Sequence, residues 1–98
     1  MRGQTSRAKA LVQFIARNLA SRPEQVFVVE VLGGPAHLIE LEVAKDDLGR
    51  LIGRSGRVAD AIRALLQILT LQEGRMYELE IVDAPPAAQA AQEDVHEP

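Results

Sequence analysis

The sequence contains no cysteine and no tryptophan, and only three of its residues are aromatic. Without cysteine the chain cannot form disulfide bonds, zinc sites with cysteine ligands or a catalytic thiol. The aromatic residues are Phe14, Phe27 and Tyr77, and we expect both phenylalanines to be buried. The chain therefore lacks the exposed aromatic platform on which RNA-recognition motifs and OB-folds stack bases.

Long apolar runs are also missing, since no segment approaches the ~20 apolar residues that span a bilayer. The N-terminal stretch is basic and free of acids up to Glu24, but Gln13, Arg17 and Asn18 interrupt any secretory apolar region. We therefore expect a first helix with a basic outer face, in a cytoplasmic protein. A mitochondrial transit peptide shares this composition and is the alternative.

The 98 residues, 47% of them hydrophobic, suffice for one globular domain with a two-layer core. The formal net charge is −3, but charge is segregated along the chain. From Asp83 onward there are four acids and no base, and no acid lies between Asp47 and Asp60, where Arg50, Arg54 and Arg57 occur. Local patches therefore matter more than the total charge.

Hydrophobic periodicity predicts the elements in the order α-β-β-α-α-β, an α+β fold in which helices cover one face of a three-stranded sheet. The predicted helices cover about 6–20, 48–52 and 56–71, and the predicted strands cover 26–32, 38–43 and 77–81. The first helix is expected to bury Leu11, Phe14, Ile15 and Leu19, and the last helix Val58, Ile62, Leu65, Leu66 and Leu69. We expect residues 1–83 to form the domain. Residues 84–98, rich in Ala, Pro and Gln, are expected to form a disordered tail.

The turn Gly53-Arg54-Ser55-Gly56 lies between two predicted helices. Glycines let a nucleic-acid backbone approach closely, and the following helix N-terminus presents free N–H groups to a phosphate. Arg54 and Ser55 can bind phosphate oxygens, and Arg50 and Arg57 flank them. A GxxG tetrapeptide is weak evidence alone, because glycines also serve a tightly packed helix corner. The helix–helix junction, the arginines and the surrounding element order favour phosphate binding.

The run from Leu48 to Arg63 resembles the I-G-x-x-G core of KH domains, and the element order is similar to the type II arrangement. Over residues 8–83 the chain resembles the KhpA family of small bacterial KH proteins. The resemblance implies single-stranded RNA held between the turn, its flanking helices and the sheet edge, and a KH turn clamps about four nucleotides. It also implies a role as an RNA chaperone or post-transcriptional regulator. The implied partners are a second KH protein of the KhpB or Jag type, or a second copy in a homodimer.

Within this resemblance, the expected RNA-binding residues are Gly53, Arg54, Ser55, Gly56, Arg50, Arg57, Ile52 and Leu51, with Val43 helping to line an aliphatic groove. We expect no enzyme activity, no cofactor and no metal. His37 and His96 have no evident partner for metal or general-base chemistry, and Ser55 has no evident base. Asp46 and Asp47 are expected to cap the short helix.

Two alternatives to RNA binding remain. One is a KH scaffold used for protein assembly, and the other is a DNA-binding helix-hairpin-helix element. Glu40, Glu42, Glu78 and Glu80 are expected on solvated strand faces. If they share one face, they would repel RNA and confine it to the helical side.

Overall fold

The computed structural model describes residues 6–83, and its element order confirms the predicted α-β-β-α-α-β arrangement. The helices are α1 (Arg7–Leu19), α2 (Leu48–Ile52) and α3 (Arg57–Glu73), and the strands are β1 (Phe27–Val31), β2 (Ala36–Val43) and β3 (Met76–Asp83). Single 3₁₀ turns cover Pro23–Gln25, Lys45–Asp47 and Arg54–Gly56. The predicted tail from residue 84 lies outside the described residues.

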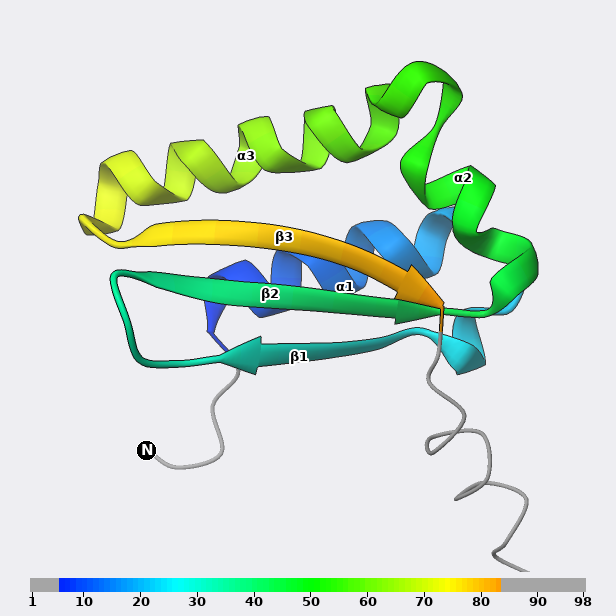
Figure 1. Cartoon of the computed structure of the whole chain (residues 1–98), viewed down its shortest axis with the longest axis horizontal. Helices are drawn as coiled ribbons and strands as arrows, with labels where there is room; N and C mark the ends of the chain where they lie inside the picture. The colour runs from blue at the N-terminus through cyan, green and yellow to red at the C-terminus, as the bar shows by residue number, and fades with distance from the viewer. Residues whose placement is uncertain (1–5, 84–98) are drawn as a thin grey trace, which may run out of the picture.

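The three strands form one sheet in the order β1-β2-β3. β1 and β2 are antiparallel and are joined by a hairpin whose two glycines, Gly33 and Gly34, have positive φ values. β2 and β3 are parallel, with Ile39 beside Leu79, so the chain must cross back along the sheet between them. This crossover consists of α2, the glycine turn and α3 (Figure 1), and the turn lies at the end of the molecule opposite the hairpin loop.

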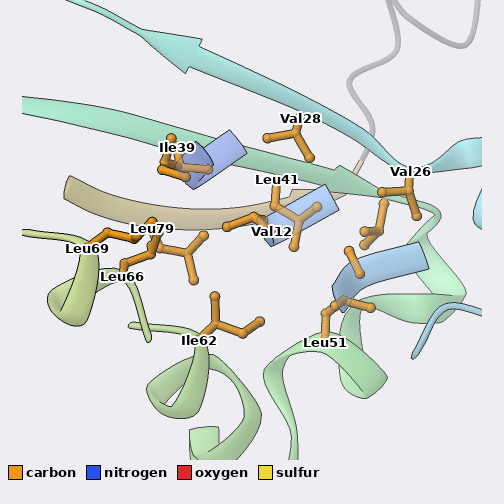
Figure 2. Close-up of a cluster of buried hydrophobic side chains, with 13 residues drawn as sticks. Val12, Val26, Val28, Ile39, Leu41, Leu51, Ile62, Leu66, Leu69 and Leu79 are labelled. Carbon is orange, nitrogen blue, oxygen red and sulfur yellow. The ribbon is translucent and has the colours of Figure 1, made fainter. Parts of the chain in front are cut away.

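The hydrophobic core lies between the sheet and the helices on one of its faces. Alternate residues of β2, namely Ile39, Leu41 and Val43, are completely buried. Figure 2 shows Ile39 and Leu41 facing side chains from the helices. The principal helical contributors to the core are Val12, Leu51, Ile62 and Leu66. The predicted alternation of β2 is therefore confirmed.

The buried face of α1 differs from the prediction. Its centre is Val12, flanked by Ala8 and Ala16, while Leu11 and Ile15 pack at the edges of the core. The small alanines let the helix backbone approach the sheet closely, which rotates the larger side chains to the flanks. The remaining two predicted core residues are exposed, Phe14 by 69% and Leu19 by 41%. The expectation that Phe14 is buried was wrong.

The buried face of α3 agrees with the prediction except at one position. Ile62, Leu66 and Leu69 are buried and Val58 packs against the core, but Leu65 is 40% exposed. Ala59 is buried in its place, because the centre of the contact with the sheet runs along the 59-62-66-69 side of the helix. Leu65 lies on the outer side of α3.

Candidate nucleic-acid interface

The backbone of the glycine turn can be built only with glycine at its first position. Gly53 has φ 81° and ψ 169°, a region that is essentially restricted to glycine. A Cβ at Gly53 would lie 2.4 Å from Val58 Cγ2 and 2.7 Å from the Val58 backbone nitrogen. The N–H of Gly53 donates to the Gly49 carbonyl at 2.8 Å and so closes α2.

The second half of the turn is also left-handed but is open to solvent. Gly56 has φ 76° and ψ 14°, and a Cβ there would meet no atom within 4 Å. Ser55, with φ 55°, is the one described non-glycine residue with a positive φ. With these backbone angles the turn ends directly before Arg57, the first helical residue of α3.

The side chains of the turn are accessible. Arg54, Ser55 and Arg57 are exposed, and neither arginine forms an ion pair within residues 6–83. The first N–H groups of the 17-residue helix α3 have no intrahelical acceptors, and the positive end of the helix dipole points the same way. Two exposed guanidinium groups, unpaired among the described residues, and a helix N-terminus therefore meet on one corner of the molecule.

The three aliphatic residues predicted to contact RNA differ in their exposure to solvent. Ile52 is exposed at the end of α2, beside the turn. Leu51 and Val43 are completely buried in the core. These two residues belong to the hydrophobic core and therefore do not line a surface groove.

Asp47 does not cap α2 as expected, since its side chain makes no capping bond to that helix. Its carboxylate is completely buried and accepts hydrogen bonds from Ser21 N at 2.9 Å, Ser21 Oγ at 2.8 Å and Arg22 N at 3.0 Å. The backbone hydrogen bond from Ser21 is the main reason why the pKa of Asp47 is lowered, and the nearby Arg50 charge lowers this pKa further. Asp47 thus ties the start of α2 to the segment after α1. The sequence carries no local signal for this contact, because its partners are 25 and 26 residues away.

Arg50 lies between the buried carboxylate and the surface. Its Nε is 3.3 Å from Asp47 Oδ1, while 61% of its side chain is exposed. The Asp47 carboxylate therefore holds the inner end of the Arg50 guanidinium, while most of the Arg50 side chain remains accessible to solvent.

The open face of the sheet is acidic. Because Ile39, Leu41 and Leu79 face the helices, the alternate residues Glu40, Glu42, Glu78 and Glu80 all lie on the opposite face. Glu40 and Glu80 are directly paired across β2 and β3. Partial burial, and then the charge of Glu40, raise the pKa of Glu42. The four glutamates therefore share one face, away from the helices.

His37 does have a carboxylate partner, contrary to the expectation. Its Nδ1 lies 3.0 Å from Glu30 Oε2, and Ser6 Oγ donates to the other oxygen of Glu30 at 2.6 Å. This cluster joins the start of α1 to the hairpin, at the end of the molecule away from the turn. His96 lies outside the described residues. Among residues 6–83 there is no group of three or more side chains suited to hold a metal ion.

No helix between residues 6 and 83 has the length and apolarity to cross a membrane. Exposed Phe14 lies with Ala10, Gln13, Arg17 and Asn18 along a shallow depression on the outer side of α1. Phe14 is therefore an exposed aromatic residue, contrary to the expectation that the chain presents none on its surface.

Comparisons with known proteins agree with this geometry. The family model of the KhpA/KhpB KH domain matches residues 9–81. RNA-binding protein KhpA of Clostridium perfringens is 40% identical over 74 residues, covering 76% of this chain and 99% of the relative. The protein of the same name from Caldanaerobacter subterraneus is 42% identical over 72 residues, covering 74% of this chain and 96% of the relative.

Among solved structures, Era in complex with MgGDPNP and nucleotides 1506–1542 of 16S ribosomal RNA is similar in fold, with a TM-score of 0.61. The match covers 90% of this chain and 34% of Era at 22% sequence identity. The matched family model, the curated relatives and the α-β-β-α-α-β order with its glycine turn lead to one conclusion. The chain belongs to the KhpA/KhpB family of KH domains.

Proposed function

We propose that this chain is a non-catalytic protein that binds single-stranded RNA by placing backbone phosphates against the turn from Gly53 to Gly56. The observation that supports this proposal most is the composition of the corner formed by the turn and the start of α3. Three features come together there: a position closed to any side chain, two exposed arginines that form no ion pair within residues 6–83, and the N-terminus of α3. These groups bind phosphate, and none of them reads base identity.

Individual roles follow from position. Gly53 and Gly56 keep the backbone accessible, Arg54 and Ser55 contact phosphate, and Arg50 and Arg57 neutralise the neighbouring phosphates. Ile52 is the aliphatic residue beside the turn against which a base or sugar can pack. Leu51 is not a direct contact, because it has no exposed surface. The relatives named RNA-binding protein KhpA support RNA binding by this chain.

The acidic sheet face directs RNA to the helical side. Glu40, Glu42, Glu78 and Glu80 make no ion pair within the described chain, so their charge is not neutralised locally. A polyanion approaching this face is repelled, while the arginine corner attracts it. A net negative protein can therefore bind RNA at one place.

A second candidate function, a scaffold for protein assembly, is favoured by the outer side of α3. Leu65, Ile68 and Leu71 are 40%, 51% and 82% exposed and lie along this side at helical spacing. We assign this stripe to self-association or to contact with a second KH protein of the KhpB type. Two turns held in one assembly raise the affinity for RNA through avidity. Such an assembly suits a cytoplasmic RNA chaperone or post-transcriptional regulator.

The experiment replaces Arg54 and Ser55 together by aspartate. Both side chains are exposed, so the melting temperature is expected to stay within a few degrees of the wild type. RNA binding, measured by fluorescence anisotropy with a random-sequence octanucleotide, is expected to be lost. The matched control is Arg17→Asp with Asn18→Asp, which makes the same charge change at two exposed residues of α1.

The outcomes separate the two functions. Loss of binding in the turn variant alone supports RNA binding at the turn. Equal loss in both variants shows a general electrostatic effect and refutes the site. Unchanged RNA binding in the turn variant, or no binding by the wild type, favours the assembly scaffold.

A further inference from the structure

The last strand ends at the same end of the molecule as the glycine turn. Figure 1 shows the end of β3 beside α2, and Asp83, its last residue, is paired with Val43 at the end of β2. From Val43 to Gly53 the chain consists of a short link, one 3₁₀ turn and α2, which together span at most about 21 Å. The spacing between neighbouring strands adds about 5 Å. The chain therefore leaves the sheet within about 26 Å of the turn.

The sequence that follows β3 carries acids and no base. Residues 84–98 contain Glu93, Asp94 and Glu97 but no lysine or arginine, and Val95 is their only large apolar residue. We call residues 93–97 the acidic segment. Glu93 is ten positions beyond the end of β3, and ten residues of extended chain span up to about 33 Å. The acidic segment is therefore long enough in reach to contact the turn.

The charges of the described residues favour one side of the molecule for the acidic segment. The open sheet face carries the glutamates of β2 and β3, which form no ion pair within residues 6–83, so this face repels further carboxylates. On the helical side, Arg54 and Arg57 are exposed and are likewise unpaired among the described residues. The nearest attractive surface to the end of β3 is therefore the arginine corner.

We propose that the acidic segment binds Arg54 and Arg57 at the turn in the RNA-free protein, and that RNA must displace it. Carboxylates take the place of phosphates, because a guanidinium binds both groups through the same fork of N–H donors. Val95 lies among the acids as exposed Ile52 lies beside the arginines, so the two sides also match in an apolar residue. The proposal rests on phosphate binding at the turn and adds an internal competitor to it.

A tethered contact of this kind has a measurable effect on RNA affinity. A connector of about ten residues places the carboxylates at an effective concentration in the millimolar range. Each exposed ion pair shifts an equilibrium constant by roughly 1.4-fold to fivefold. Two or three such pairs at the turn are therefore expected to lower RNA affinity by roughly three- to tenfold.

The first experiment compares RNA affinity between the full chain and two variants that have the same net charge as each other. The acidic-segment variant replaces three carboxylates by amides: Glu93→Gln, Asp94→Asn and Glu97→Gln. The sheet control removes the same charge from the open sheet face: Glu40→Gln, Glu78→Gln and Glu80→Gln. A fluorescein-labelled random-sequence octanucleotide is titrated by anisotropy at about 0.15 M salt, where charges more than about 8 Å away are largely screened.

We expect the acidic-segment variant to bind RNA roughly three- to tenfold more tightly than the full chain, and the sheet control to gain less than about twofold. Equal gains in both variants would show a general effect of net charge and overturn the proposal. An unchanged affinity in the acidic-segment variant would also overturn it.

The second experiment detects the contact without RNA. Because the chain has no cysteine, Ala91→Cys provides a unique site for a nitroxide spin label two positions before the acidic segment. We expect the label to broaden the NMR amide signals of residues 53–57. This broadening should fall by at least half at about 1 M salt, and also when the three acids are replaced by amides.

The two readouts separate the contact from RNA binding itself. Broadening at the turn that is equal with and without the three acids would overturn the proposal, as would broadening that responds to these acids only elsewhere on the described chain. If neither the full chain nor the acidic-segment variant binds the octanucleotide, the proposed function is refuted and the competition with it. The spin label then still decides whether the acidic segment contacts the turn.

Discussion

Replacing Gly53 by alanine tests whether the turn geometry depends on packing against Val58. The substitution forces a side chain into a glycine-only backbone region, which costs about 1–3 kcal/mol. The new Cβ also meets Val58 Cγ2 at 2.4 Å and the Val58 backbone nitrogen at 2.7 Å. Overpacking of this kind costs a further 1–3 kcal/mol or so. We expect a total destabilisation of about 4 kcal/mol, a large part of the stability of a domain this size.

Gly56→Ala is the matched control, because Gly56 also has a positive φ but its Cβ would meet no neighbour. Only the cost of the left-handed conformation remains, about 1–2 kcal/mol. For a domain of this length, 1 kcal/mol lowers the melting temperature by roughly 4–8 °C. We expect losses of roughly 16–32 °C for Gly53→Ala and roughly 4–16 °C for Gly56→Ala, measured by circular dichroism at 222 nm.

A double variant identifies the origin of the difference. Val58→Ala removes Cγ2 but keeps the backbone nitrogen, so it is expected to recover part of the stability lost in Gly53→Ala. Equal destabilisation by Gly53→Ala and Gly56→Ala would refute the packing argument. It would leave positive φ as the sole requirement for glycine in the turn.

Three further predictions concern RNA affinity, pH and assembly. If two or three phosphates are bound, the logarithm of RNA affinity should fall with the logarithm of salt concentration with a slope of roughly −1.5 to −2 for single strands. Arg54→Ala should make this slope less steep by about 0.7, and a wild-type slope near zero would contradict phosphate binding. Hydrogen bonds lower the pKa of Asp47 in the folded state, so the ionised carboxylate stabilises the fold. This stability is fully present above the ordinary pKa of 3.8 and is lost as pH falls through the lower pKa of the folded state. Below pH 3.8 the melting temperature should therefore fall more steeply in the wild type than in Asp47→Asn, which is already less stable at pH 7; parallel curves would disprove this role. Ile68→Glu on the exposed stripe of α3 should abolish self-association in sedimentation equilibrium with little change in melting temperature, and a wild type that is monomeric at all concentrations would exclude the homodimer.

The sequence predicts the fold well where large apolar residues mark both the element and its buried face. The alternation Ile39-Leu41-Val43 is an example, and the bounds of α2 are also reproduced. The prediction fails where small residues determine the packing. Ala8 and Ala16 set the approach of α1, and a pattern based on large side chains therefore places Phe14 inside.

The candidate site shows the same division. The turn, its arginines and the helix junction are local features and are visible in the sequence. The steric contact of Gly53 with Val58 depends on the backbone path between them, and the burial of Leu51 depends on how α2 meets the sheet. The hydrogen bonds from Ser21 and Arg22 to Asp47 join segments far apart in the chain, and no periodicity reports them.

The parallel pairing of β2 with β3 has a consequence for synthesis of the chain. β3 is the last strand to be made, and its Leu79 completes the surface against which Ile62 and Leu66 of α3 pack. While β3 is still inside the ribosome, α3 lacks its strand partner. We therefore expect the proposed RNA-binding surface to be complete only after residue 83 has emerged, so that a nascent chain does not bind the message from which it is translated.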